Sequence, residues 1–200
     1  ANFIQASSAD EPGYWSAVFP DVFMDGDNDG FSAVVGNPPY IASKNRRLQG
    51  RGFSGQTDSY LFFINAALEG DLVKQGGALS MVLPDPFLVR GNAERSRRIM
   101  MENWNLVSML HISKAFPDAL VANAVPVCKK ENAAGNTFQA ARIERSADRQ
   151  AFARRPPDTA KRLSQSVRRS VVTSQRRYEM LYLLERDGFE QVACRIHGEN

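Results

Sequence analysis

The alternation of apolar and polar positions predicts short strands and helices between residues 31 and 128. The β-branched run Phe31–Val35 is entered through the turn-forming segment Asp25–Gly30 and stopped by Asn37-Pro38-Pro39. Short apolar runs bounded in this way are typical of strands inside a sheet. We therefore predict a buried strand that ends directly before Asn37.

Two amphipathic helices are predicted further along the chain. The first begins at Asp58, a plausible N-cap, and Gly76-Gly77 lies beyond its last turn. Its apolar residues recur at helical spacing: Leu61, Ile64, Ala67, Leu68 and Leu72. The second opens at Asn92 and runs to about Asn103. Each helix is expected to bury one apolar face.

Three further strands are predicted around these helices. They are Ala78–Leu83, which Pro84 closes, then Leu106–Ile112 and Ala124–Cys128. Pro126 cannot donate to a strand ladder and therefore favours an edge position for the last strand. Alternating strands and helices predict an open α/β sheet of mostly parallel strands, with ligands at their carboxyl ends.

The periodic signal fades beyond Glu131. Residues 133–177 are rich in Arg, Ser, Ala and Gln and contain few large apolar side chains, so a linker or a poorly specified domain is expected. A last helix is predicted over Tyr178–Leu184.

Composition narrows the class of protein. The 200 residues are 43% hydrophobic and 24% charged, which is typical of a globular chain. No apolar run approaches the roughly 18 residues of a membrane span, and no signal-peptide pattern opens the chain. Cys128 and Cys194 lack metal-binding spacing. We predict a cytoplasmic protein with no metal site and no membrane contact.

Charge is distributed unevenly although the net value is only +3. The chain has no Lys or Arg before Ile41, and basic residues are frequent from Arg142 to Arg177. The first basic cluster contains Lys44, Arg46, Arg47 and Arg51. Such clusters suit contacts to nucleic-acid phosphates, although a solvated basic face has the same composition.

Two segments resemble ligand-binding motifs, but each lacks a part that its motif requires. Asp25–Gly30 fits half of an EF-hand loop, but Gly36 occupies the twelfth position, where a bidentate Glu is needed. Gly50–Gly55 fits G-x-G-x-x-G, but it follows a polar basic segment rather than a hydrophobic strand. We interpret them as an acidic turn and a glycine-rich basic loop.

The tetrapeptide Asn37-Pro38-Pro39-Tyr40 has residue types suited to methylating a planar amino group. The side-chain oxygen of Asn37 and the backbone carbonyl of Pro38 can accept the two amino protons and so localise the nitrogen lone pair. The two prolines stiffen the backbone that presents these acceptors. Tyr40 can stack on a base. We predict Asn37, Pro38 and Tyr40 as catalytic residues, and Pro39 with Tyr40 as substrate-binding residues.

Five segments together resemble restriction-modification adenine-N6 DNA methyltransferases. Gly30–Ile41 looks like the catalytic strand and loop of that family, and one further segment upstream and three downstream also resemble it. These are Phe19–Phe23, Asp58–Ile64, Gly76–Leu88, and Ala115–Ala119 with Val125. The resemblance runs from about Trp15 to Lys130.

The resemblance implies S-adenosylmethionine as methyl donor, base flipping, and double-stranded DNA as substrate within a restriction-modification or related phage-defence system. It predicts a partial Rossmann-like methyltransferase sheet, with residues 1–130 as the catalytic half and residues 131–200 as a basic linker or the start of a target-recognition region. In the family the glycine-rich cofactor loop precedes N-P-P-Y, and this chain begins too late to contain it. Activity of the chain alone is therefore not assured, and a missing N-terminal half or a specificity region is an expected partner.

Some assignments stay open. Phe152 is a weak candidate for the aromatic residue on the other face of a flipped base. Methyltransferases that modify protein glutamine also use N-P-P-Y, and a DNA-binding remnant without cofactor would keep the basic surface. A comparison of DNA with protein substrates tests the first alternative, and binding of labelled S-adenosylmethionine tests the second.

Overall fold

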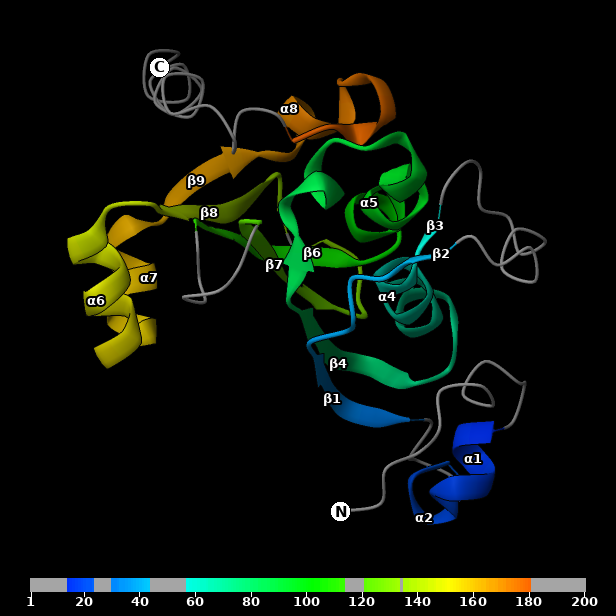
Figure 1. Cartoon of the computed structure of the whole chain (residues 1–200). Coiled ribbons are helices and arrows are strands. Elements are labelled where there is room, and N and C mark those ends of the chain that lie inside the picture. Colours follow the sequence, from blue (N-terminus) through cyan, green and yellow to red (C-terminus); the bar gives the residue numbers. More distant parts are fainter. Residues whose placement is uncertain (1–13, 24–29, 44–56, 114–120, 134, 181–200) are drawn as a thin grey trace.

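The computed structural model describes residues 14–23, 30–43, 57–113, 121–133 and 135–180, which form one mixed sheet with helices around it (Figure 1). The sheet has seven strands. Their order is β1 (Phe31–Gly36), β4 (Val73–Met81), β7 (Asn123–Lys129), β6 (Asn105–Ile112), β8 (Thr137–Ile143) and β9 (Gln165–Arg168), and the short β5 (Leu83–Pro84) also pairs with β7. The predicted strands near residues 31, 78, 106 and 124 are all present.

Most strands run in one direction, as predicted for this fold class. β1 is parallel to β4, and β6 is parallel to β8. β7 is antiparallel to β4, β5 and β6, and β9 is antiparallel to β8. It follows that β1, β4, β5, β6 and β8 share one direction and only β7 and β9 oppose it. The α/β prediction is confirmed, with β7 as an antiparallel strand inside the sheet.

The edge position predicted from Pro126 is wrong, because β7 lies between β4 and β6. Pro126 pairs with Met109 of β6. On its other side, β7 pairs with β4 up to Val127 and resumes with β5 at Ala124. Pro126 therefore lies opposite the interruption between β4 and β5, where a missing backbone donor disturbs the ladder least.

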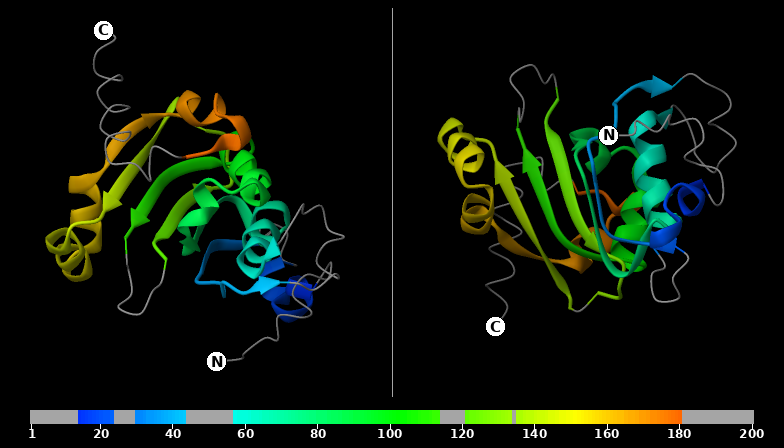
Figure 2. Two further views of the ribbon diagram at one scale, coloured as in Figure 1. Left: turned by 45° about the horizontal axis from the view of Figure 1, so that its top comes forward. Right: turned by 90° about the horizontal axis from the view of Figure 1, so that it is seen from below.

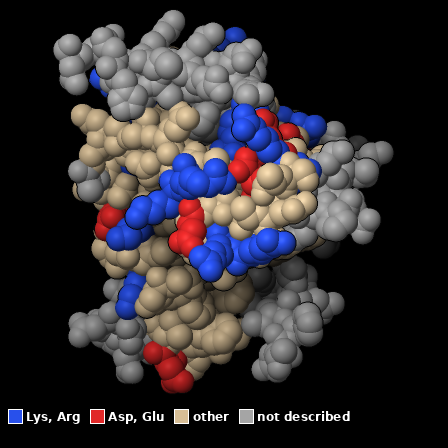
Figure 3. Space-filling view, turned by 90° about the vertical axis from the view of Figure 1, so that its left-hand side faces the viewer, with Lys and Arg blue, Asp and Glu red and all other residues tan. Residues whose placement is uncertain are grey.

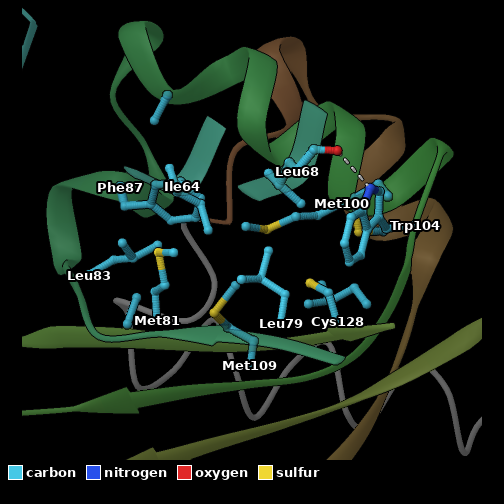
Figure 4. Packing of buried hydrophobic residues seen from close by; sticks show 14 of the residues in the cluster. Ile64, Leu68, Leu79, Met81, Leu83, Phe87, Met100, Trp104, Met109 and Cys128 are labelled. Carbon is cyan, nitrogen blue, oxygen red and sulfur yellow. Dashed lines mark hydrogen bonds between the residues drawn. The ribbon is translucent and has the colours of Figure 1, made fainter. Parts of the chain in front are cut away.

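The hydrophobic core lies between the sheet and the helices α4 (Ser59–Glu69) and α5 (Glu94–Glu102) (Figure 4). The predicted apolar face of the first helix is buried at Leu61, Ile64, Ala67 and Leu68. Trp104 closes one end of the core, and its indole N–H donates to the Leu68 carbonyl at 3.1 Å. Cys128 is also buried there, and burial raises the pKa of its thiol to about 12.

The first helix is shorter than predicted. It ends at Glu69, and β4 begins at Val73, whereas the helix was expected to reach Leu72 and close at Gly76-Gly77. The glycine pair instead lies within β4, where Gly76 has φ +77° and the register against β1 shifts. The pattern misled because Leu72 continues the helical spacing although it lies in a turn after the helix.

The burial predicted for the first strand is wrong. β1 pairs only with β4 among the described strands, and Val35 is 80% exposed. Val34 packs against the core, so one face of β1 is covered. A β-branched run indicates a strand but does not reveal whether a neighbour covers both its faces.

The rest of the chain adds short elements at the sides of the sheet. These are α1 (Tyr14–Val18), α2 (Pro20–Phe23), β2 (Ala42–Ser43) paired with β3 (Thr57–Asp58), η1 (Asp85–Leu88), η2 (Gly91–Ala93), α6 (Ser146–Arg154), α7 (Pro156–Leu163), α8 (Arg169–Thr173) and η3 (Arg176–Tyr178). None of the helices in the described ranges is long and apolar enough to cross a lipid bilayer.

Residues 133–177 are more ordered than their composition predicts. β8 and β9 extend the same sheet, and the hairpin of α6 and α7 connects them (Figure 2). The apolar residues are few, but Phe138, Val167 and Val172 are buried and join the core. The proposed division of the chain near residue 130 stays a prediction. The helix expected from Tyr178 is not seen in its described part, because Tyr178 ends η3 and Glu179 is extended, and residues 181–184 lie outside the described ranges.

Candidate active site

The Asn37–Tyr40 loop begins where β1 ends, at the carboxyl edge of the sheet. The Val82 amide donates to the carbonyl of Gly36 at 2.9 Å and ties the end of β1 to the junction of β4 and β5. Pro38 is buried, whereas Asn37 and Pro39 are exposed. The loop therefore lies at the carboxyl end of a strand, as the sequence predicted, and ligand binding there stays a prediction.

Ser59, the first residue of α4, holds the loop from one side. Its hydroxyl donates to the carbonyl of Pro39 and accepts the amide of Ile41 at 3.0 Å. The Ser59 amide in turn donates to the Ile41 carbonyl at 2.8 Å. One side chain therefore bonds the backbone on both sides of Tyr40.

Asp58, the predicted N-cap residue, pairs with an arginine instead of capping the helix. It occupies the N-cap position of α4 with extended backbone but makes no side-chain capping bond. Its carboxylate instead faces Arg90, with an N–O distance of 3.4 Å. The pattern correctly placed Asp58 at the N-cap position, but it contains no signal that the neighbouring Ser59 bonds the loop.

Tyr40 is held through its hydroxyl. That hydroxyl donates to the carbonyl of Val82 at 2.9 Å and accepts the side-chain amide of Asn123 at 3.0 Å. Asn123 opens β7 and is 1% exposed, so the pair is a partly buried polar contact. Burial raises the pKa of Tyr40, and the Asn123 hydrogen bond partly offsets that rise. The phenol is therefore neutral and remains a donor near neutral pH.

The Tyr40 ring also has an aromatic support. It meets Tyr60 edge to face, with ring centroids 6.1 Å apart, and Tyr60 meets Phe87 in the same way at 6.5 Å. Tyr40 itself remains 37% exposed. The hydroxyl anchor and the edge-to-face contact together fix the plane of a ring that still has accessible surface.

Two acceptors of the loop are left for a substrate. In the described part of the chain, neither the Asn37 side chain nor the Pro38 carbonyl has a hydrogen-bond partner. Both belong to a backbone that Ser59 and Tyr40 hold in place. A planar amino group could therefore be bound without first breaking an internal bond of the protein.

The other predicted site residues either lie elsewhere in the fold or fall outside the described residues. Phe152 lies in α6, which follows β8, four strand positions from β1, so the structure does not place it opposite Tyr40. Lys44, Arg46, Arg47 and Arg51 lie outside the described residues. The same holds for most of the acidic turn, for the Gly50–Gly55 loop and for the Ala115–Ala119 motif.

The described part of the chain lacks the loop that usually holds an adenosyl cofactor. No described segment that precedes β1 is a glycine-rich turn after a strand, which is the feature that holds an adenosyl cofactor in such sheets. The described ranges also contain no group of three or more His, Cys, Asp or Glu that could bind a metal.

The chain matches a known protein family over the segment that contains this loop. Residues 3–116 match the model of the Eco57I restriction-modification methylase family, and this stretch includes β1, the Asn37–Tyr40 loop and α4. The chain belongs to this family. No curated protein matches the chain.

Solved structures show the same fold at low identity. A structure of a type I restriction-modification system is 20% identical, with a TM-score of 0.56 over 73% of this chain and 36% of the other. The methyltransferase subunit of a type I system from Streptococcus thermophilus is 15% identical, with a TM-score of 0.53 over 84% of this chain and 38% of the other. A candidate class I S-adenosylmethionine-dependent methyltransferase from Listeria monocytogenes is 12% identical, with a TM-score of 0.51 over 66% and 42%. The chain thus spans little more than a third of the first two proteins.

Proposed function

We propose that this chain carries the catalytic strand and loop of an enzyme that methylates the N6 amino group of adenine in double-stranded DNA. The observation that supports it most directly is the pair of unengaged acceptors, the Asn37 side chain and the Pro38 carbonyl, on a loop that Ser59 and Tyr40 hold rigidly. Membership of a restriction-modification methylase family supports DNA as the substrate class.

The chemistry required is the activation of a weak nucleophile. The lone pair of the adenine amino nitrogen is delocalised into the ring. Hydrogen bonds from the two N6 protons to Asn37 and Pro38 concentrate that pair on nitrogen and aim it away from the loop. S-adenosylmethionine, the expected donor, supplies an electrophilic methyl carbon. When bound in the complete enzyme, it would give up its methyl group to the N6 lone pair held by Asn37 and Pro38 and leave as the neutral thioether, while one N6 proton would pass to solvent.

Tyr40 has a separate task in this proposal. The target amino group is inaccessible inside a stacked duplex, so adenine must be rotated out of the helix. The exposed face of the Tyr40 ring offers a stacking surface for the displaced base. Because the ring is already oriented, little conformational entropy is lost when the base arrives.

The whole enzyme needs parts beyond this loop. We propose that a cofactor-binding segment and a DNA-specificity region complete it, and that it acts in a restriction-modification or related phage-defence system. Both parts would belong to the remaining length that its structural relatives have.

The test is transfer of tritium from labelled S-adenosylmethionine by the complete protein to DNA, with protein glutamine offered in a parallel arm. Asn37→Ala should lose at least about 3 kcal/mol of transition-state stabilisation, a rate loss of roughly 150-fold, with DNA binding retained. Asn132→Ala, an exposed asparagine beyond β7, is the matched control and should be unaffected. Near-normal turnover of Asn37→Ala would contradict the mechanism. Label in glutamine alone would favour a protein substrate. The absence of both methyl transfer and cofactor binding would favour a non-catalytic remnant.

A further inference from the structure

The helical hairpin between β8 and β9 presents basic side chains at the same end of the sheet as the candidate site. α6 begins three residues after Ile143, the last residue of β8. Because β8 and β1 run in the same direction, the hairpin leaves the sheet at the edge where Asn37 follows β1. In Figure 2 the hairpin lies at this edge on the side of the sheet away from β1.

Charge on the hairpin and its flanks is mainly positive. Between residues 145 and 168 the chain has seven basic and two acidic residues. The basic residues are Arg145, Arg149, Arg154, Arg155, Lys161, Arg162 and Arg168, and the acids are Asp148 and Asp158. Figure 3 shows Lys and Arg forming a band across this side of the molecule, with fewer Asp and Glu among them.

Part of this charge is used within the protein. Arg162 of α7 pairs with Asp148 of α6 at 2.6 Å and joins the two helices. Arg149 donates to the backbone carbonyl of Glu144, and the Glu144 carboxylate pairs with Arg142. The nearby acids Glu144 and Asp148 are therefore already paired with arginines that shape the hairpin.

Four cations remain on the outer surface, and we call them the hairpin cations: Arg145, Arg154, Arg155 and Lys161. All four are exposed, and none has an acidic partner in the described part of the chain. Among the described residues of the hairpin, Asp158 is the one acid left beside these four cations, so positive charge is in excess. An extended polyanion with condensed counterions relieves the repulsion between like charges in excess.

We propose that the hairpin cations bind the sugar–phosphate backbone of the duplex whose adenine enters the Asn37–Tyr40 loop. Four strand spacings separate β1 from β8, about 19 Å at roughly 4.8 Å each. Along B-DNA that span corresponds to about half a helical turn of roughly 34 Å. The contacted phosphates therefore lie some five or six base pairs from the flipped adenine. The choice of DNA as the partner rests on the proposed function, but duplex binding by the hairpin cations can be tested without measuring methylation.

The experiment measures the salt dependence of duplex binding by the 200-residue chain. Fluorescence anisotropy with a labelled duplex of about three helical turns is followed between roughly 50 and 200 mM salt. Arg154→Gln/Arg155→Gln and Arg145→Gln/Lys161→Gln each remove two hairpin cations. The control Lys74→Gln/Lys129→Gln removes the same charge at the opposite edge, where β4 begins and β7 ends. Thermal unfolding of each variant identifies any loss of folding.

Each double variant of the hairpin cations should lower the slope of log K against log salt by about 0.9 for every phosphate that it no longer neutralises. The total is close to two for each double variant, and the control should leave the slope unchanged. An unchanged slope in both hairpin pairs, or an equal change in the control, would overturn the proposed surface. Methyl transfer by the complete protein is measured separately. Transfer with no hairpin effect would reject this surface alone, and a hairpin effect without transfer to adenine would reject the proposed function alone.

Discussion

At the scale of single residues, the candidate site depends on side chains that hold the Asn37–Tyr40 loop as much as on the loop itself. Asn37, Pro38 and Tyr40 were recognisable from sequence because the tetrapeptide combines acceptors with a stiff backbone. Ser59 and Asn123 were not, because each contacts the loop across a long separation in the chain. Hydroxyl and amide side chains are common everywhere, and only the fold indicates which of them meet the loop.

Substitutions of Tyr40 separate its ring from its hydroxyl. Sequence alone predicts that Tyr40→Phe keeps most activity, because stacking needs only the ring. The structure adds a stability effect, because the Phe variant loses two hydrogen bonds worth about 1 kcal/mol each. We expect Tyr40→Phe to lower Tm while transfer stays within about tenfold of the parent. Tyr40→Ala should lose a further 1–3 kcal/mol, roughly 5- to 150-fold, with reduced 2-aminopurine fluorescence at the target base.

A double-mutant cycle gives the control for Tyr40. Combining Tyr40→Phe with Asn123→Ala should show a coupling of about 1 kcal/mol in unfolding experiments, because the two side chains share one hydrogen bond. If Tyr40→Phe were as inactive as Tyr40→Ala, the hydroxyl and not the aromatic face would be the functional group.

At the scale of elements, a buried arginine joins segments that are far apart in sequence. Arg97 of α5 is 0% exposed, and its guanidinium donates only to backbone carbonyls. The acceptors are Phe87, Arg90, Arg177 and Tyr178. Burial lowers the pKa of Arg97 to about 10, so it remains charged near neutral pH. It thereby fixes η1 and η3 to α5, with Arg177 and Tyr178 both at positive φ.

Arg97→Met should therefore destabilise the protein strongly. The substitution keeps an unbranched side chain but removes this donor from the carbonyls of Phe87, Arg177 and Tyr178 and leaves Arg90 with the Ala93 amide, at an expected total of about 3 kcal/mol or more. Urea unfolding measures the change. Arg98→Met, one residue along the same helix and exposed, should change stability by less than about 0.5 kcal/mol. Equal stability of the two variants would mean that these carbonyls find other donors.

At the scale of the whole molecule, stability should fall on mild acidification. His111 is 5% exposed, and neither ring nitrogen has a hydrogen-bond partner in the described part of the chain. Burial lowers the His111 pKa below its ordinary value of 6.5, and Arg142 lowers it further, while Asp85 and Glu144 oppose this. As pH falls below about 6.5, the unfolded chain therefore binds a proton at His111 before the folded chain does. Acidification favours unfolding from there down to the folded-state pKa of His111.

The measurement is the free energy of unfolding between about pH 7 and pH 5, where one such proton contributes a slope of up to about 1.4 kcal/mol per pH unit. His111→Gln should remove this part of the slope. Asp85 acts in the opposite sense: burial raises its pKa, so the folded chain takes up this proton before the unfolded chain does and acidification relieves the cost of burying the carboxylate. A slope that persists unchanged in His111→Gln would assign the acid sensitivity to other groups.

The local pattern of the sequence determined the four strands near residues 31, 78, 106 and 124, the two core helices and the candidate Asn37–Tyr40 loop. These features depend on residues close together in the chain, whose spacing and backbone restrictions can be read directly. It also determined the α/β class, because strands and helices alternate. It did not reveal the end of α4 at Glu69, since Leu72 continues the helical spacing into the turn.

Only the tertiary structure decided which surfaces are covered and which distant residues meet. It placed β7 between β4 and β6 despite Pro126, left Val35 exposed, and joined β8 and β9 to the sheet although their apolar residues are few. It also brought Ser59 and Asn123 to the loop and set the hairpin cations at the catalytic edge. Burial, strand order and long-range hydrogen bonds arise from packing the elements together, and no local pattern contains that information.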